Sequence, residues 1–254
     1  MLVFMKKYLL ALGVALTLFS CTTVRPLIDA KTTNYVVSGE MAAEDTAVIR
    51  LVSPYKQTLS KDMSRVLAVS DSELLKDKPE SNLTNFMADM LLEEGRRFCA
   101  ENGIDLPQVA YVNYGGIRSS LPEGEITVQK IFELMPFENE MVFVKITAEK
   151  FYEMVQKIAE RDGDGVAGIK LGIRDAKVAS LKIDGKDFEK DRSYVVVTND
   201  YIAQGGDNMV MFLNPQTFVG SKRTIRDLII HYMERLNHEG KIISAKKDGR
   251  IFYE

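Results

Sequence analysis

The sequence is poor in the residues that build disulfide frameworks and metal sites. Its 254 residues include two cysteines, Cys21 and Cys99, and two histidines, His231 and His238. One possible pair of cysteines makes no disulfide framework, and Cys99 lies in a helical stretch, where we expect a buried apolar side chain. The two histidines lie about two turns apart on one predicted helix, too far to share an ion. The sequence therefore predicts no metal ligands in this chain.

Positive charge is not in excess either. The formal net charge is -3 at pH 7, which argues against a nucleic-acid partner, because domains that bind phosphate backbones carry a clear basic excess. No Gly-x-Ser-x-Gly segment is present, and no Cys–His pair is indicated, so no catalytic residue is predicted. No linker rich in proline or glycine divides residues 32–254, which favours a single domain there.

The apolar run at the amino terminus is short. Two lysines precede the run from Tyr8 to Phe19, which is too short to span a bilayer comfortably and is typical of a signal peptide. We interpret Leu18-Phe19-Ser20-Cys21 as a lipobox, which predicts a lipoprotein signal peptide over residues 1–21 and a lipid on Cys21. The protein is then exported and anchored to the bacterial cell envelope, at its periplasmic or surface face, through the lipid only. A signal anchor, or a secretory peptide with an incidental cysteine, is the alternative.

The rest of the chain consists of a short tether, residues 22–31, and one domain, residues 32–254, in which helices and strands are mixed. Helices are predicted over residues 81–102, 128–134, 148–161 and 224–236. Strands are predicted over residues 34–52, 109–112, 140–146, 179–183, 186–188, 194–198 and 250–253. The absence of strict strand–helix alternation indicates an α+β fold with helices packed on a mixed β-sheet. Asp162-Gly163-Asp164-Gly165 is predicted as a polar loop rather than a calcium loop, because the residues that follow offer no ligands.

A glycine-bearing segment, Asn113 to Arg118, follows the predicted strand at residues 109–112. Gly115 and Gly116 would let the backbone approach a ligand closely. Arg118 offers a planar fork of donors for phosphate or carboxylate, and Asn113 offers both donors and an acceptor. A tight turn with a solvated arginine is the structural alternative.

Two further segments have the same character. Phe137 follows Pro136 and could expose its ring for stacking, although a phenylalanine under a loop is more often a core anchor. Tyr201 follows a predicted strand and precedes Gly205, Gly206 and Asp207. A tyrosine ring and a carboxylate in this arrangement could hold a flat ring and a sugar hydroxyl. The alternative is a glycine-rich turn with a solvated aspartate.

The order of these segments resembles the C-terminal, substrate-recognition domain of the 5'-nucleotidase family. The resemblance runs from about residue 50 through Asp207. The segments that carry it are Ser81 to Phe86, Asn113 to Arg118, Gly124 to Thr127, Pro136-Phe137 and Asn199 to Asp207.

The resemblance implies a role for each matching residue. Phe137 and Tyr201 would sandwich a nucleobase, and Asn113 would contact the base. Arg118 would face the phosphate, and Asp207 would hold the ribose hydroxyls. With Gly115, Gly116, Gly205 and Gly206, these residues form the predicted substrate-binding set. The family has a further phosphate-binding arginine before the Ser-Asn-Leu segment, where this sequence has Lys76-Asp77-Lys78-Pro79. Lysine lacks the bidentate fork, which leaves phosphate binding open.

The family hydrolyses phosphate esters with a two-metal site in an N-terminal domain, for which the sequence before residue 32 has no room. We therefore expect no cofactor in this chain and no hydrolysis by it alone. One hypothesis is a split 5'-nucleotidase, in which a separate metallophosphatase-domain protein supplies divalent metals and this chain recognises the nucleotide. Another is a stand-alone lipoprotein that binds nucleosides or nucleotides. A decayed domain without a ligand is the third.

Overall fold

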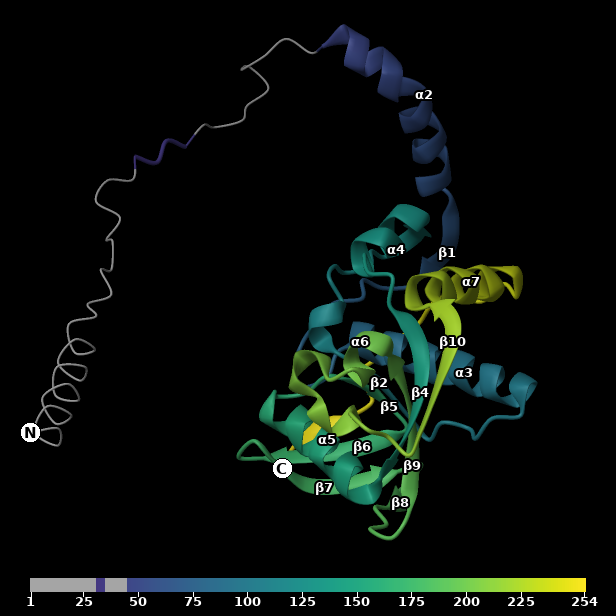
Figure 1. The fold of residues 1–254 in the computed structure, drawn as a ribbon. Helices are drawn as coiled ribbons and strands as arrows, with labels where there is room; N and C mark the ends of the chain where they lie inside the picture. Colours follow the sequence, from purple (N-terminus) through teal and green to yellow (C-terminus); the bar gives the residue numbers. More distant parts are fainter. Residues whose placement is uncertain (1–30, 35–44) are drawn as a thin grey trace, which may run out of the picture. The chain divides into compact units, whose positions relative to one another are not determined.

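The computed structural model describes residues 31–34 and 45–254 (Figure 1). The predicted signal peptide with Cys21, and residues 22–30 of the predicted tether, lie outside this part of the chain. The chain divides after Arg50 into two compact units, and every sheet belongs to the unit from Leu51 to Glu254. None of the helices within the described ranges is long and apolar enough to cross a membrane.

A five-stranded mixed sheet organises the second unit, with the strand order β10-β4-β9-β2-β5. Its strands are β2 (Val109–Val112), β4 (Glu140–Thr147), β5 (Gly165–Ala167), β9 (Ser193–Asn199) and β10 (Thr217–Thr224). β9 pairs with β2 in parallel, whereas the other three pairings are antiparallel. A mixed sheet with packed helices confirms the predicted α+β fold.

Both faces of this sheet are buried. Successive side chains of a strand point to opposite faces, so one strand can contribute to two cores. In β2, Ala110 and Val112 belong to one core, and Val109 and Tyr111 to the other. The first core packs against three helices: α3 (Asn82–Asn102), α4 (Val128–Leu134) and α7 (Ile225–His238). The second packs against α5 (Ala148–Glu160) and a second sheet (Figure 1). A sheet covered on both faces holds its strand ends in fixed positions.

Two smaller sheets complete the unit. The second sheet has the order β11-β6-β7-β8, and its strands are β6 (Ile169–Arg174), β7 (Lys177–Ile183), β8 (Lys186–Asp187) and β11 (Ile251–Tyr253). β7 and β8 pair in antiparallel fashion and form the hairpin predicted from the sequence. β1 (Val66–Ser70) pairs with β3 (Gly124–Thr127).

The long helix α3 begins and ends where the sequence predicts. The Ser81 hydroxyl accepts a hydrogen bond from the backbone N–H of Thr84, whose side chain in turn accepts one from the Ser81 N–H. This reciprocal pair satisfies two N–H groups that the first turn of a helix leaves unpaired. Gly103 ends the helix with a φ of 66°, a conformation that glycine adopts without penalty. Cys99 is buried as predicted, and burial raises the pKa of its thiol to about 11.

The extended segment predicted over residues 34–52 is wrong for residues 46–52. These residues begin helix α2 (Thr46–Met63). Val48, Leu51, Val52, Tyr55 and Leu59 recur at intervals of three to four residues, which is the helical period. Over a short window, apolar and polar residues also alternate loosely, and this local alternation is the reason for the wrong strand prediction.

Two threonines at helix starts allow a matched test of capping. The Thr224 hydroxyl accepts a hydrogen bond from the N–H of Asp227 at the start of α7, whereas Thr127 at the start of α4 makes no such bond. We expect Thr224→Ala to lower the free energy of unfolding by about 1 kcal/mol, and Thr127→Ala to lower it by clearly less. Urea unfolding of both variants measures the difference. Equal losses would show that the Thr224 cap adds nothing.

Candidate functional site

Three strand ends meet at one edge of the central sheet. β2 and β9 are parallel neighbours, so their carboxyl ends lie at the same edge. β4 runs antiparallel to β9 and starts there, with Met141 opposite Asn199. The segments after β2, before β4 and after β9 are the three segments singled out in the sequence. Loops beyond the carboxyl ends of neighbouring strands are a common place for ligand sites.

These segments enclose a hollow of about 410 Å³, a volume within the usual range of small-molecule sites. The predicted residues that line it are Asn113, Gly115, Gly116, Arg118, Phe137, Tyr201 and Asp207. Met135, Asn139 and Asn199 line it as well, although none of them is in the predicted set. The structure thus brings seven predicted residues from three separate segments to one place.

A chain of hydrogen bonds orients the Asp207 carboxylate. Asn199 donates from Nδ2 to Oδ1 of Asn113 over 3.2 Å, and Asn113 donates from Nδ2 to Oδ2 of Asp207 over 2.7 Å. The Tyr201 hydroxyl donates to the other carboxylate oxygen, Oδ1, over 2.9 Å. Each oxygen of Asp207 therefore accepts one protein donor, and the carboxylate has a fixed orientation in the pocket.

Gly205 and Gly206 shape the loop instead of lining the pocket. Gly205 has a φ of 86°, and a Cβ atom on Gly206 would lie 2.6 Å from ring atoms of Tyr201. Asp207 itself has a φ of 51°, in the left-handed region that is strained for residues other than glycine. The Tyr201 hydroxyl accepts a hydrogen bond from the Asp207 N–H over 3.1 Å. Tyr201 thus supports both the backbone and the carboxylate of Asp207.

The two aromatic rings of the pocket are partly open to solvent. Phe137 is 39% exposed and Tyr201 is 46% exposed. Arg226, a buried residue at the start of α7, holds the turn that carries Phe137: it donates to the Phe137 carbonyl over 3.5 Å and pairs with Glu138. The Arg118 guanidinium lies 5.9 Å from the centre of the Phe137 ring. Phe137 is therefore not a buried core anchor, and its ring is accessible for stacking.

Asn139 is also held in place at the pocket wall. Its side chain donates from Nδ2 to Oδ1 of Asp200 over 2.9 Å. Its position directly before β4 and two residues after Phe137 was the only sequence signal available for it. Asn199 is the last residue of β9 and also caps the short helix α6 (Asp200–Ala203), because its side chain accepts a hydrogen bond from the Ile202 N–H.

The lysines that precede α3 support the pocket from outside. Lys76 donates from Nζ to the carbonyl oxygens of Tyr114 and Ile117, over 3.1 and 2.6 Å. Burial lowers the pKa of this ammonium group, and the positive charges of Arg118 and Lys78 act in the same direction. Neither Lys76 nor Lys78 lines the pocket. Their ammonium groups bind the backbone of neighbouring loops.

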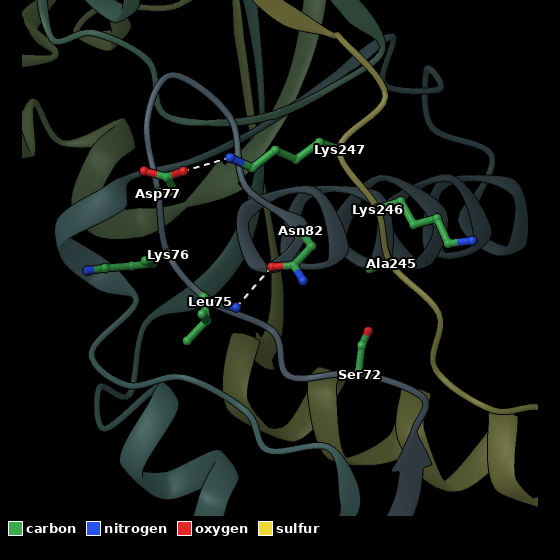
Figure 2. Close-up of a pocket in the computed structure, with 8 residues that line it drawn as sticks. All are labelled: Ser72, Leu75, Lys76, Asp77, Asn82, Ala245, Lys246 and Lys247. Atoms are coloured by element: carbon green, nitrogen blue, oxygen red, sulfur yellow. Dashed lines mark hydrogen bonds and ion pairs between the residues drawn. The ribbon is translucent and has the colours of Figure 1, made fainter.

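A second hollow, of about 500 Å³, lies beside Lys76 (Figure 2). Figure 2 shows the Lys76 side chain pointing away from the ion pair of Lys247 with Asp77, which measures 2.6 Å. The Asn82 side chain accepts a hydrogen bond at Oδ1 from the N–H of Leu75 over 2.9 Å. In this larger hollow Lys247 pairs with Asp77, whereas in the Asp207 pocket the side chains of Asn113 and Tyr201 both donate to one carboxylate.

The comparisons with known proteins identify the family. The family described as "5'-nucleotidase, C-terminal domain" matches residues 65–214, more than half of the chain. The chain belongs to the 5'-nucleotidase C-terminal domain family. The predicted resemblance to this domain is thereby confirmed, and the residues that line the Asp207 pocket lie within the matched range.

Relatives of this C-terminal domain chain include longer nucleotide-processing proteins. A 5'-nucleotidase of Vibrio vulnificus is 22% identical over 237 residues, which cover 89% of this chain and 41% of that protein. The trifunctional nucleotide phosphoesterase protein YfkN of Bacillus subtilis is 28% identical over 188 residues, 68% of this chain and 12% of that protein. The chain therefore spans less than half the length of these curated relatives.

Solved structures of the family share the fold. The 5'-nucleotidase precursor of Thermus thermophilus aligns with a TM-score of 0.67 at 25% identity, covering 84% of this chain and 44% of that one. A putative 5'-nucleotidase of Staphylococcus aureus aligns with a TM-score of 0.68 at 16% identity, covering 86% and 46%. Within the described part of this C-terminal domain chain, no three His, Cys, Asp or Glu side chains are grouped to hold a metal ion.

Gly206 in the Asp207 loop and Gly115 in the pocket wall differ in the space that a methyl group would find. A Cβ on Gly206 would meet the Tyr201 ring and carbonyl oxygen at 2.6 Å, whereas one on Gly115 would meet Asp207 at an ordinary 3.8 Å. We expect Gly206→Ala to lower the free energy of unfolding by about 1–3 kcal/mol, the usual cost of overpacking, and Gly115→Ala to leave it nearly unchanged. Thermal unfolding of the two variants tests this. Similar melting temperatures would contradict the tight contact between Gly206 and Tyr201.

Proposed function

We propose that this chain binds nucleosides and nucleotides in the Asp207 pocket and provides substrate recognition to a 5'-nucleotidase-type phosphohydrolase. The observation that carries the proposal is the pocket itself: two part-exposed rings, Phe137 and Tyr201, and one oriented carboxylate, Asp207, line the same hollow. A nucleoside has the matching parts, a flat base and a vicinal diol. The family of the chain supports the same assignment.

The base would stack on the aromatic rings. Every nucleobase has a π-face, so stacking provides affinity with little preference among bases. Asn113 lies within the same pocket but is engaged on both sides, by Asn199 and by Asp207. One N–H of its amide remains for a ligand. The proposed role of Asn113 is therefore twofold: it orients Asp207 and offers a single donor.

The ribose would bind through Asp207. An ionised carboxylate has about four acceptor positions, and the protein uses two of them, one on each oxygen. The remaining positions suit the two neighbouring hydroxyls of a ribose. Charge-assisted hydrogen bonds of this kind are about twice as strong as neutral ones, which makes the diol a favourable anchor.

The phosphate would lie on the side of Arg118. Among the residues that line the pocket, Arg118 is the cationic one. Its fork of donors matches a phosphate group. Lys76 and Lys78, by contrast, donate to backbone carbonyls, so Arg118 alone would supply the charge that distinguishes a nucleotide from a nucleoside.

Hydrolysis would require a second protein with a metallophosphatase domain. The described residues of this chain do not provide a metal-ligand cluster. Divalent metals held by that partner would activate the attacking water. This chain would hold the base and ribose, and remote binding energy of this kind positions the reacting group. We further propose that residues 32–254 form the recognition domain and that a lipid on Cys21 keeps the protein at the cell envelope.

Calorimetric titration of the purified full chain with adenosine tests the binding site. We expect Tyr201→Ala to weaken adenosine binding by about 1–3 kcal/mol, the usual contribution of one stacked base. Tyr152→Ala is the matched control, because Tyr152 is a similarly exposed tyrosine, 41% against 46%, outside the pocket. Equal losses in the two variants, or no binding by the unaltered chain, would contradict the assigned pocket.

The same samples, assayed for phosphate release from AMP with manganese present, separate recognition from catalysis. We expect no release by the pure chain and release when the metallophosphatase partner is added. Release by the pure chain would overturn the split arrangement. Binding that no partner converts to hydrolysis would favour the stand-alone binding lipoprotein.

Arg118→Met tests the phosphate assignment. A hydrogen bond to a charged group contributes about 1.5–3 kcal/mol, so we expect the variant to lose at least about tenfold in AMP affinity and little in adenosine affinity. Arg174→Met, at an arginine that is 63% exposed and paired with Glu254, is the control. Calorimetry with both ligands measures the ratio of affinities. An unchanged ratio would remove Arg118 from the phosphate side of the site.

A further inference from the structure

The loop Arg161-Asp162-Gly163-Asp164 follows α5 and contributes no side chain to the pocket lining. It nevertheless contacts two of the three segments that shape the pocket, the one after β2 and the one after β9. Asp164 is only 4% exposed, although a carboxylate is costly to bury without partners. A polar turn on the surface would need neither a buried acid nor long-range contacts, so this loop has another role.

Arg161 holds the loop that carries Asp207. Its guanidinium group donates from Nη2 to the backbone carbonyl of Asp207 and from Nη1 to the Tyr111 hydroxyl over 3.5 Å. Asp207 and Asn208 both have positive φ angles, 51° and 56°, which are costly for residues with a side chain. The bond from Arg161, which does not line the pocket, stabilises this strained backbone.

Asp164 holds the loop that carries Arg118. Its Oδ1 accepts a hydrogen bond from the Tyr114 N–H over 2.8 Å, at the start of the turn η1 (Tyr114–Gly116). Its Oδ2 accepts one from the Tyr111 hydroxyl over 3.0 Å and lies 3.7 Å from the Arg161 guanidinium. Burial raises the pKa of this carboxyl group, and the same three partners oppose the rise.

The segment before α3 completes the assembly. Lys78 donates from Nζ to the carbonyl of Arg161. Gly163, with a φ of 96°, packs so closely on Pro79 that a Cβ atom would overlap the Pro79 carbonyl oxygen. Residues 161–164 therefore stand between the segment at residues 76–80, the phosphate-side loop at residues 113–118 and the ribose-side loop at residues 205–208.

We propose that Arg161 and Asp164 are positioning residues that hold the ribose-side and phosphate-side loops at a fixed separation and thereby set the selectivity of the pocket for ligands with a ribose diol. The inference rests on the proposed function, because it concerns recognition in that same pocket. Neither residue touches the ligand. Arg161 acts through the backbone of Asp207, and Asp164 acts through Tyr114 and through the orientation of Arg161.

The test compares adenosine with 2',3'-dideoxyadenosine, which lacks the 2'- and 3'-hydroxyls that form the ribose diol. In calorimetric titrations of the full chain, the ratio of the two affinities reports how well Asp207 is placed. We expect Arg161→Met to weaken adenosine binding by about tenfold or more, because small misplacements of a binding group are costly, and to leave dideoxyadenosine binding nearly unchanged. The ratio then falls toward one. A purely structural role would weaken both ligands together.

Three further variants complete the design. Arg161→Lys keeps one donor for the Asp207 carbonyl and is expected to recover part of the ratio. Asp164→Asn keeps the shape of the loop but loses the charge opposite Arg161, and is expected to lower the ratio to a smaller extent. Arg192→Met, at an arginine that is 44% exposed and paired with Glu189, is expected to change nothing.

The outcomes separate this inference from the proposed function. If the unaltered chain binds adenosine in preference to dideoxyadenosine and Arg161→Met and Asp164→Asn keep that ratio, the positioning role is overturned and the proposed function stands. Equal weakening of both ligands overturns the positioning role in the same way. If the unaltered chain binds neither ligand, the proposed function fails and the inference fails with it.

Discussion

The parallel pairing of β2 with β9 is the constraint on which the pocket depends. In this register Ala110 lies opposite Val197, so the two strands end together and bring Asn113 beside Asn199, within 3.2 Å. A slip of one residue would turn every side chain of β9 to the other face of the sheet. Valines on both faces of these strands belong to the two cores. Core burial therefore fixes the register, and the register fixes the hydrogen-bond chain that ends at Asp207.

Local signals in the sequence were sufficient for the elements that carry strong end markers. Ser81 and Gly103 delimit α3, and the Asp184-Gly185 turn joins β7 to β8. Sequence patterning does not predict β10, where Gly220 and Lys222 break the strand pattern and the pairing with β4 stabilises an extended chain. The order of strands in the sheet also has no local signal, because it depends on contacts between distant segments.

The residues in and around the pocket also divide into those with a local sequence signal and those without one. Short motifs, together with the family resemblance, locate seven of the residues that line the pocket, in segments that follow or precede strands of the central sheet. Arg161 and Asp164 lie outside those motifs. Their bonds span 46 residues to Asp207 and 50 residues to Tyr114. In the sequence, Arg161 is the last residue of a predicted helix and Asp164 belongs to a predicted polar loop. Nothing local shows which loops will pack against them.

The cationic side chains around the pocket have distinct functions, and their chemistry explains the division. An ammonium group is compact and carries three donors, which suits Lys76 for binding two backbone carbonyls and lying 4.1 Å from the centre of the Tyr114 ring. In that position it stabilises the phosphate-side loop but is drawn away from a ligand. An arginine in this region, which the family resemblance implies, would extend a planar fork further than a lysine can. Under the proposed function, the lysine would contribute less to phosphate binding than that arginine, and more of the affinity would come from Phe137, Tyr201 and Asp207. A pocket built in this way would discriminate ligands by their sugar more than by their phosphate.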